Sequence, residues 1–479
     1  MDFFNKLAEI IGNLISTAND ALYGYLLIIL LVAAGLYFFI RTKAAPFRML
    51  GEQFRAVTEK PKDKGEVSSF QALMVSTASR VGTGNIVGVA TAICAGGYGA
   101  IFWMWVIAII GSASAFVEST LAQIYKRKGP DGAYGGPAYY IEGALKKRGL
   151  AVLFSVLLII TYGVGFNMLA SFNLQSTFAG YSFYEVGKTS WIIGLVMAAL
   201  VAFCLFGGGK RIIKVTGVLV PFMGIAYILV ALIVVALNIG VLPSVIQKIF
   251  TDAFNFRAIF GGFAGSCIMY GIKRGLFSNE AGVGSAPNAS ASADVAHPVK
   301  QGLVQVLSVF IDTLLVCSAT AFMCVCSGVE PSKDFAGADY VQMCLAKTFG
   351  SFGPIFITVA MVLFAFTTLI GNLYYVDKAF FHIFGKKPGK VFNTIYYVIA
   401  SLLILLGAGL SADLLWDIAD VTMGLMTLVN IPVIFILGKY AFRALKDYEN
   451  QRKQGNDPVF LADSIGIKDK LDYWNQEEN

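Results

Sequence analysis

The sequence predicts an all-α integral membrane protein with about eleven transmembrane helices, ten of them arranged as two inverted repeats of five. Composition is the first observation: 57% of the 479 residues are hydrophobic and only 14% are charged, whereas a soluble domain carries about 25% charge. The second is that apolar runs long enough to cross a bilayer recur along the chain. The third is that basic residues gather in alternate connectors. We therefore expect a protein surrounded by a lipid bilayer.

The apolar runs are assigned as spans because about 20 helical residues cross a hydrocarbon core of roughly 30 Å. Residues 1–21 carry Asp2, Glu9 and Asp20 and lack the cleavage pattern of a signal peptide, so we expect an amphipathic helix at the outer surface. Two histidines and seven scattered cysteines argue against a haem or zinc centre. The expected spans are residues 22–40, 69–96, 100–125, 151–178, 191–208, 215–240, 258–285, 301–328, 351–379, 391–412 and 415–438.

The positions of lysine and arginine predict how the spans are oriented. These residues collect after the first, third, fifth, ninth and eleventh spans, in residues 41–64, 126–148, 210–214, 386–390 and from 439 on. The opposite connectors hold few basic residues. Because cytoplasmic loops are enriched in lysine and arginine, we expect the amino terminus outside the cell and the carboxyl terminus in the cytoplasm.

Ten spans remain when the first is removed, and they divide into two halves of five. Five is an odd number, so the halves have opposite orientations, as in transporters in which the first helix of each half is broken near the membrane midplane. The expected segments are 1–66 for the amino-terminal part with the extra helix, 67–257 for the first repeat, 258–440 for the second repeat and 441–479 for a cytoplasmic tail.

Glycine-rich stretches mark the expected breaks. The first lies at Gly82-Thr83-Gly84-Asn85 and the second between Gly271 and Gly284. A glycine inside a helix costs about 1 kcal/mol relative to alanine, and freed backbone groups are tolerated at membrane depth where they line a cavity. The alternative is that small residues only let neighbouring helices approach closely.

Three motifs carry a resemblance to a known family. They are Gly82-Thr83-Gly84-Asn85, the run GGYGAIFWMW over residues 96–105 and the run KRGLFSNEAGVGSAP over residues 273–287. They resemble the alanine or glycine:cation symporter family, and the resemblance extends over residues 68–440. It implies sodium- or proton-coupled uptake of small neutral amino acids, on the fold of the leucine transporter, in the plasma membrane of a prokaryote. Ser79-Arg80-Val81, together with the run FVESTLAQ over residues 116–123, resembles the branch that includes glutamine carriers.

The first break suits the carboxylate of an amino acid. Backbone N–H groups at Thr83, Gly84 and Asn85 begin a half-helix whose dipole favours an anion. Further substrate contacts are expected from other helices, although packing is the alternative role for each asparagine and aromatic side chain. These residues are Asn167 and Ser171 in the third core span, Tyr270, Gly271, Gly275 and Phe277 near the second break, and Asn372 in the eighth core span.

Oxygen atoms on the other side of the first break suit a cation. The carbonyls of Ala78 and Val81 precede the break, and sodium is a hard ion that prefers oxygen ligands. The resemblance adds the hydroxyls of Thr367 and Thr368 to this sodium site. The alternative is that each threonine bonds its own helix backbone.

Charged residues inside membrane segments are functional or paired by default. Arg80 is expected in a gating or structural ion pair, or as a clamp for the substrate carboxylate. The other charged residues singled out inside predicted spans are Glu118, Lys273, Arg274 and Glu280.

Sodium-coupled import of alanine, glycine or glutamine by alternating access is the predicted function, with sodium co-transported and no organic cofactor. Proton coupling is the nearest alternative, with Glu118 and Asp312 as candidate proton carriers. A passive channel is less consistent with polar residues that concentrate around two breaks. The sequence contains no recognisable nucleophile–base pair, phosphate loop or nucleic-acid motif, so neither an enzyme nor a nucleic-acid partner is expected.

Overall fold

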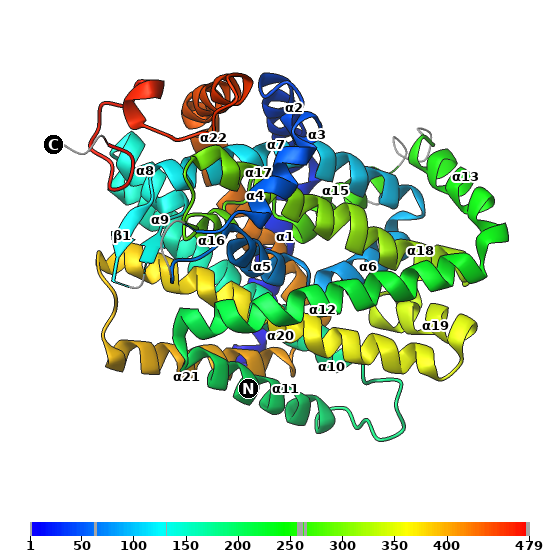
Figure 1. Ribbon diagram of the computed structural model, residues 1–479. Coiled ribbons are helices and arrows are strands. Elements are labelled where there is room, and N and C mark those ends of the chain that lie inside the picture. The colour runs from blue at the N-terminus through cyan, green and yellow to red at the C-terminus, as the bar shows by residue number, and fades with distance from the viewer. Residues whose placement is uncertain (1, 62–64, 131, 256–261, 263–265, 476–479) are drawn as a thin grey trace.

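Long helices that cross one another build the molecule, with a short β-hairpin at one end (Figure 1). The computed structural model describes residues 2–61, 65–130, 132–255, 262 and 266–475. Helices dominate because a bilayer offers the backbone no hydrogen-bond partners, so each spanning segment must satisfy its own polar groups. In chain order, with η for π- or 3₁₀-helical segments, the elements are α1 (Asp2–Ala21), η1 (Leu22–Leu26), α2 (Leu27–Arg41), α3 (Ala45–Arg48), α4 (Leu50–Thr58), α5 (Ser69–Arg80), η2 (Gly84–Gly88), α6 (Val89–Gly96), α7 (Gly99–Ile124), β1 (Arg127–Gly129), β2 (Gly132–Tyr134), α8 (Pro137–Leu145), α9 (Arg148–Leu158), η3 (Ile159–Gly165), α10 (Phe166–Ser176), α11 (Thr189–Leu205), α12 (Gly208–Leu237), η4 (Ile239–Val241), α13 (Leu242–Ala253), α15 (Cys267–Asn279), α16 (Pro287–Ser290), α17 (Pro298–Val309), η6 (Phe310–Cys317), α18 (Ser318–Cys326), η7 (Lys333–Phe335), α19 (Ala338–Phe349), α20 (Phe352–Phe384), α21 (Lys390–Gly407), α22 (Ala412–Lys453) and η8 (Ala462–Ile465).

Eight helices in the described part of the chain are long and apolar enough to cross a membrane. Two shorter apolar helices, Gly84–Gly96 and Thr189–Leu205, accompany them. Helix length alone therefore does not reach the predicted number of about eleven spans. In the described residues, the predicted spans 69–96 and 258–285 contain only shorter helices, and the predicted span 191–208 forms a helix of 17 residues. The eight are Gly12–Arg41, Gly99–Ile124, Arg148–Ser176, Gly208–Leu237, Pro298–Cys326, Phe352–Phe384, Lys390–Gly407 and Ala412–Lys453.

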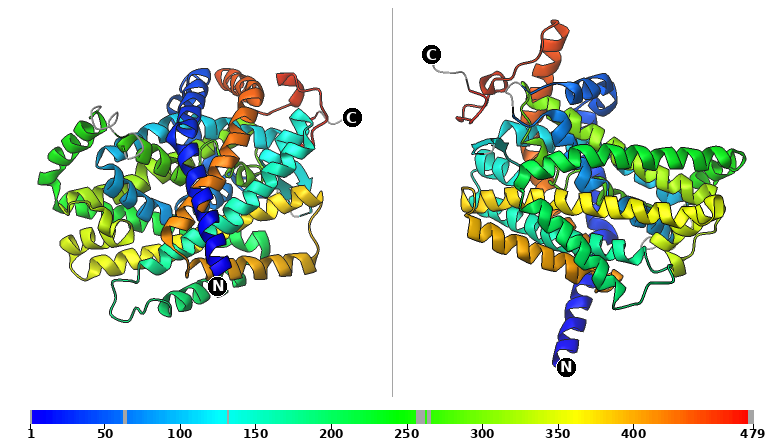
Figure 2. Two further views of the ribbon diagram at one scale, coloured as in Figure 1. Left: turned by 180° about the vertical axis from the view of Figure 1, so that it is seen from behind. Right: turned by 60° about the horizontal axis from the view of Figure 1, so that its bottom comes forward.

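The amino-terminal helix differs from the prediction. α1, η1 and α2 follow one another directly, so residues 2–41 form one helix, whose start extends beyond the rest of the protein (Figure 2). Ala21 and Leu27, which flank η1, both have right-handed helical backbone angles. The helix predicted over residues 1–21 is present as α1, but it is not a separate element, because the backbone remains helical into the first span.

The connector between the fifth and sixth predicted spans also differs. α11 ends at Leu205 and α12 begins at Gly208, so Lys210, Arg211 and Lys214 lie in the first turns of α12 and not in a loop. The Arg211 side chain donates a hydrogen bond of 2.6 Å from Nη1 to the carbonyl of Phe203. This bond satisfies one of the carbonyls that the end of α11 leaves free.

Both predicted helix breaks are confirmed. α5 ends at Arg80 and η2 begins at Gly84. α15 ends at Asn279, and α16 begins only at Pro287. The predicted boundary between the two repeats, at residues 257 and 258, lies outside the described residues.

Two of the segments predicted to be cytoplasmic, residues 126–148 and the carboxyl-terminal segment, share one end of the molecule. β1, β2, α8 and the segment after α22 lie at this end, whereas α13 and α19 lie at the opposite end (Figures 1 and 2). Ion pairs of 3.2 Å from Arg127 to Asp472 and from Lys146 to Asp469 join the carboxyl-terminal segment to this end. The basic cluster over residues 126–148 therefore lies on the same side as the carboxyl-terminal segment.

Candidate substrate and ion site

The first break is held open by a side chain that takes over a backbone hydrogen bond. The N–H of Gly82 donates to Oδ1 of Asn85 at 2.8 Å, not to the carbonyl of Ala78 four residues earlier as a continuing helix requires. Gly82 also lies so close to Thr368 that a Cβ would collide with that hydroxyl. Glycine and asparagine at these positions therefore allow α5 to end where α20 passes.

Asn85 also fastens the first break to two other elements. Its Nδ2 donates to Oδ1 of Asp312 in η6 at 2.7 Å and to Oγ of Ser278 in α15 at 3.0 Å. Ser278 Oγ in turn donates to Oδ2 of Asp312 at 2.6 Å. The backbone N–H of Asn85 was predicted to bind the substrate, but it donates to the carbonyl of Gly82 at 3.1 Å. The side chain is committed to the internal bonds above. Asn85 therefore fixes the position of the first break relative to α15 and η6.

The second break depends on left-handed backbone angles. Glu280, Gly282 and Gly284 have φ values of 53°, 85° and 94°, a region that favours glycine. Glu118 Oε1 accepts from the N–H of Gly282 at 3.3 Å, and Asn430 Nδ2 donates at 2.9 Å to the Gly282 carbonyl and to Oε2 of Glu118. Glu118 is thus a structural partner of the break, a role that the sequence could not specify.

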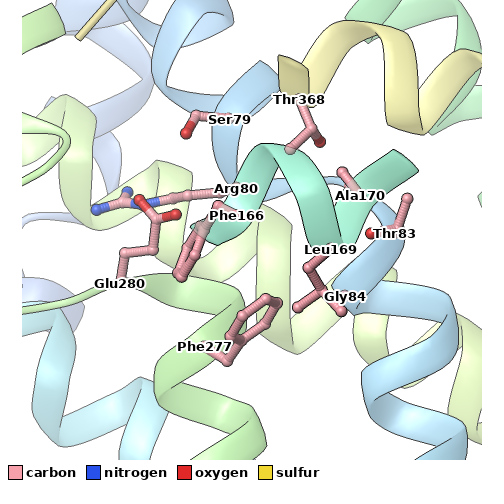
Figure 3. A pocket seen from close by; sticks show the side chains of 11 residues that line it. Ser79, Arg80, Thr83, Gly84, Phe166, Leu169, Ala170, Phe277, Glu280 and Thr368 are labelled. Atoms are coloured by element: carbon pink, nitrogen blue, oxygen red, sulfur yellow. The ribbon is translucent and has the colours of Figure 1, made fainter. Parts of the chain in front are cut away.

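A narrow cavity lies where the two breaks meet helices α10 and α20 (Figure 3). The room left for the centre of a water molecule is about 10 Å³, close to what one water needs. The side chains are therefore closed around the site, and an amino acid requires them to move apart. The cavity is lined by Ser79, Arg80, Gly82, Thr83, Gly84, Phe166, Leu169, Ala170, Phe277, Glu280 and Thr368.

Four residues predicted for the site line this cavity: Thr83, Gly84, Phe277 and Thr368. Phe277 covers the bare backbone, because a Cβ on Gly84 would lie 2.7 Å from Cε1 of its ring. The Phe277 ring also packs at 4.7 Å between centroids against Phe166 of α10. The two rings close one wall of the cavity, as Figure 3 shows. Phe166 is a lining residue that sequence analysis missed, since one aromatic among 38 phenylalanines gives no signal.

The predicted asparagines form a chain behind the cavity wall. Asn372 Oδ1 accepts from Oγ of Ser79 at 2.6 Å, and its Nδ2 donates to Oδ1 of Asn167 at 2.9 Å. Asn167 Nδ2 and the hydroxyl of Ser171 are buried without a hydrogen-bond partner in the described part of the chain. Through Ser79 the chain joins α5 to α20 and α10.

The third core span reaches the first break through a residue that was not predicted. Asn173 Nδ2 donates to Oγ1 of Thr83 at 3.2 Å. Asn167 and Ser171 were chosen instead because they lie four apart on one helical face. Asn173 lies on another face of α10, and only the packing of α10 against the break shows that this face is used.

Three other predicted residues pack against α6 and α7 and do not line the cavity. The Cβ of Tyr270 lies 2.8 Å from an ideal Cβ on Gly96, and Cβ atoms on Gly271 and Gly275 would lie 2.6 Å from the carbonyl of Ala100 and 2.5 Å from Ile107. The expected contribution of bare backbone by Gly271 and Gly275 is therefore corrected: these two small residues permit close helix packing. Tyr270 packs against Gly96 and does not line the pocket.

The two threonines of the predicted sodium site point in different directions. Thr367 Oγ1 donates to the carbonyl of Leu363 at 3.0 Å and lies 3.5 Å from Sδ of Met223 in α12. Thr368 Oγ1 is buried without a partner in the described residues and lies beside Gly82. The backbone-bonding alternative holds for Thr367, whereas Thr368 presents a free oxygen to the end of α5, where Ala78 and Val81 are buried.

Arg80 brings a buried positive charge to the cavity. Its Nη1 donates to Oε1 of Gln305 at 3.3 Å, while Nε and Nη2 have no hydrogen-bond partner within the described chain. The carboxyl groups of Glu118, Glu280 and Asp312 are its electrostatic neighbours, and Figure 3 shows the Arg80 guanidinium beside Glu280.

The basic pair on α15 binds an acidic residue that the sequence analysis did not identify. Asp420 of α22 accepts from Lys273 at 2.9 Å and from Nη2 of Arg274 at 3.1 Å. Glu280, the acidic residue that follows this pair in the sequence, instead accepts a short hydrogen bond from Ser285. Arg274 and Asp420 are 146 residues apart, so local spacing carries no information about this pair.

Comparison with known proteins gives the same architecture. MhsT in complex with L-phenylalanine, a solved structure, matches with a TM-score of 0.54 over 80% of this chain and 93% of that chain, at 15% identity. This likeness shows the fold: an all-α membrane protein of the leucine-transporter type.

Relatives in sequence show the family. The amino-acid carrier protein AlsT of Bacillus subtilis is 44% identical over 99% of both chains. The probable sodium/glutamine symporter GlnT of the same organism is 43% identical over 98% of this chain and 97% of its own, and the sodium/alanine symporter AgcS of Methanococcus maripaludis is 35% identical over 92% and 98%. These relatives are named as carriers and symporters, not as enzymes. The family profile matches residues 8–462, and the chain belongs to the sodium:alanine symporter family.

Proposed function

We propose that the protein is a sodium-coupled symporter that imports a small neutral amino acid, namely alanine, glycine or glutamine, by alternating access. The observation that carries this proposal is the cavity at the two helix breaks, which has bare backbone at Gly84 and a free hydroxyl at Thr368. Membership of the sodium:alanine symporter family supports it.

The substrate carboxylate is proposed to bind at the start of the half-helix Gly84–Gly96, with Thr83 and Gly84 closest to it. A helix start offers free N–H groups and the positive end of the dipole. Two nitrogens of Arg80, Nε and Nη2, have no partner in the described residues, and they favour glutamine among the three substrates because its side-chain amide oxygen accepts hydrogen bonds. Phe277 and Phe166 then enclose the aliphatic part of the substrate.

Sodium is proposed to bind between α5 and α20. The carbonyls of Ala78 and Val81 and the hydroxyl of Thr368 are its ligands, since sodium prefers oxygen ligands and Thr368 lies beside the end of α5. Thr367 is left out of this set because its hydroxyl bonds its own helix and faces α12. Ion and substrate then share the residues that follow Arg80, so each orders backbone that the other uses.

The proposed orientation places the amino terminus outside and the carboxyl-terminal segment in the cytoplasm of a prokaryotic cell, at its plasma membrane. The basic residues 126–148 and the carboxyl-terminal segment lie together at one end of the molecule, and lysine and arginine are enriched on the cytoplasmic side. Alternating access is proposed to move two inverted repeats, residues 67–257 and 258–440, relative to each other.

Proton coupling is the second candidate. Two relatives, YrbD of Bacillus subtilis and a carrier of Bacillus sp. (strain PS3), are named as sodium/proton-dependent alanine carriers. Glu118 and Asp312 are fully buried carboxyl groups beside the breaks. Both accept several hydrogen bonds, for example from Asn430 and Asn85, which favours a structural role for them.

Uptake into proteoliposomes tests the proposal. Labelled alanine or glutamine is offered with an inward sodium gradient at equal pH, with an inward proton gradient in choline, or with neither. Accumulation with the sodium gradient alone is the expected result. Accumulation driven by protons alone supports the second candidate, and equilibration under all three conditions contradicts symport.

Substrate choice is tested by competition with unlabelled amino acids and by Arg80→Lys. Lysine keeps the positive charge beside Glu118, Glu280 and Asp312 but lacks the planar fork of donors. The variant is expected to lose competition by glutamine more than competition by alanine. Equal losses for both amino acids contradict the assigned role of Arg80.

A further inference from the structure

The amino-terminal helix, which is additional to the ten core helices, takes part in a charged cluster between α15 and α22. α1 packs along α22, and α2 packs along α7. Asn19 near the end of α1 is 6% exposed. Its burial is notable because two polar neighbours on the same helix, Thr17 and Asp20, are exposed.

Asn19 bridges the two core helices with its amide group. Its Nδ2 donates to Oδ1 of Asp417 in α22 at 2.5 Å, and its Oδ1 accepts from Nζ of Lys273 in α15 at 3.1 Å. The same Nζ atom of Lys273 lies 2.9 Å from Oδ2 of Asp420. One amide therefore holds both an acidic side chain of α22 and the basic side chain that pairs with Asp420. Tyr23, one turn further along, also donates from its hydroxyl to the Asp420 carbonyl at 3.3 Å.

The cluster continues directly to the wall of the cavity. Arg274 pairs with Asp420 and lies with its guanidinium 4.0 Å from the centre of the Trp416 ring. Trp416 packs at 4.9 Å between centroids on Phe277, which lines the cavity. α15 begins beside α13, where Cys267 Sγ lies 3.6 Å from the Asp252 carbonyl. The charged cluster therefore lies between the α13 end of the molecule and the cavity.

We infer that Asn19 is a positioning residue for the barrier that separates the cavity from the outside. Opening toward the outside requires α15 and α22 to separate, and this motion breaks the bonds from Asn19 to Lys273 and Asp417 together with the ion pair to Asp420. Asn19 thus stabilises the closed arrangement by holding Lys273 in reach of Asp420. The inference rests on the proposed function only in taking the α13 end as the outer side.

The test measures how readily a cysteine in the cavity reacts from each side of the membrane. The seven native cysteines are free; six are buried and Cys94 is partly exposed, so the reporter is Ala170→Cys in a Cys94→Ser background. A membrane-impermeant methanethiosulfonate reagent is applied to right-side-out and to inside-out vesicles, without substrate. Asn19→Leu removes both hydrogen bonds at similar volume. Asn13→Leu, on the exposed side of the same helix, is the matched control.

Asn19→Leu is expected to raise the labelling rate at least about tenfold in right-side-out vesicles, because a hydrogen bond to a charged group contributes about 1.5–3 kcal/mol. The rate in inside-out vesicles is expected to stay unchanged. Asn13→Leu is expected to match the parent protein on both sides. An equal rise on both sides indicates general loosening and overturns the inference, as does an unchanged rate.

A second pair of variants tests the same bridge from α22. Asp417→Asn keeps an oxygen that accepts from Asn19, so its labelling rate is expected to stay near that of the parent protein, whereas Asp417→Leu is expected to behave like Asn19→Leu. Equal rates for the two Asp417 variants overturn the inference even where Asn19→Leu does not fold. Labelling reports barrier opening whichever amino acid or ion is carried, so failure of the proposed sodium symport is recognised separately in the uptake assay.

Discussion

Thr368→Val changes the proposed sodium site while keeping the shape of the side chain. The hydroxyl of Thr368 is buried beside Gly82 without a partner in the described residues, so its removal costs no internal hydrogen bond. A contact between a polar group and a charge contributes about 1.5–3 kcal/mol, and each 1.4 kcal/mol corresponds to a factor of about ten in affinity. We expect the half-saturating sodium concentration for uptake to rise at least about tenfold.

The same variant is expected to weaken sodium binding without destabilising the sodium-free protein, and thermal unfolding measures this stability. Leaving a buried polar group unpaired costs about 1–3 kcal/mol, so Thr368→Val is expected to unfold at an equal or higher temperature than the parent protein in sodium-free choline buffer. Sodium at about 100 times its dissociation constant stabilises the parent protein by about 2.7 kcal/mol. The variant is expected to lose most of this gain at the same sodium concentration.

Thr367→Val is the matched control, one residue away on the same helix. Its hydroxyl donates to the carbonyl of Leu363, and such bonds inside membrane proteins contribute about 0.6 kcal/mol on average. A small loss of stability with an unchanged sodium dependence is expected. The reasoning is refuted if both valine variants weaken sodium dependence equally, or if Thr368→Val keeps the full stabilisation by sodium.

Three further predictions concern other parts of the site and the start of α17. Asn372→Leu leaves its two buried partners unpaired, which costs about 1–3 kcal/mol each. A lower unfolding temperature and a higher KM are expected. An unchanged unfolding temperature argues against the hydrogen bonds from Asn372 to Ser79 and Asn167. Gly84→Ala places a Cβ 2.7 Å from the Phe277 ring and is expected to reduce uptake at least about tenfold, with partial recovery in Phe277→Leu; Gly149→Ala, which points into open space, is the control. Burial lowers the pKa of His297 from its usual 6.5, so the unfolded chain takes up the proton first and stability falls as the pH drops below about 6.5. His297→Asn is expected to flatten this fall in stability between pH 7.5 and 5.5, and an unchanged slope contradicts the assignment to His297.

The breaks could be predicted from sequence because their cause is local. Glycines within an apolar run lower helix stability wherever the run lies, and the motif Gly82–Asn85 contains both the flexible residue and the side chain that replaces the helical bond. The same signal was ambiguous at Gly271 and Gly275. A glycine can either expose backbone groups to a ligand or let two helices pack closely. Only the position of α7 shows that Gly271 and Gly275 do the second.

The contacts that join the helices could not be predicted, because their partners are distant in sequence. Asn85 binds Asp312 across 227 residues, and Arg274 binds Asp420 across 146. Helical geometry places Thr367 and Thr368 about 100° apart around the axis, yet the sequence does not state which of them faces α5. Each of these assignments depends on how α20, α22 and η6 pack around the breaks.

The central claim is that sodium and substrate bind together at the first break. Its most direct test is calorimetric: the dissociation constant of the amino acid is measured with and without sodium, and that of sodium with and without the amino acid. Reciprocity requires the same coupling factor in both directions, and we predict a factor of at least about five in favour of joint binding. Amino-acid affinity that is indifferent to sodium would contradict the account.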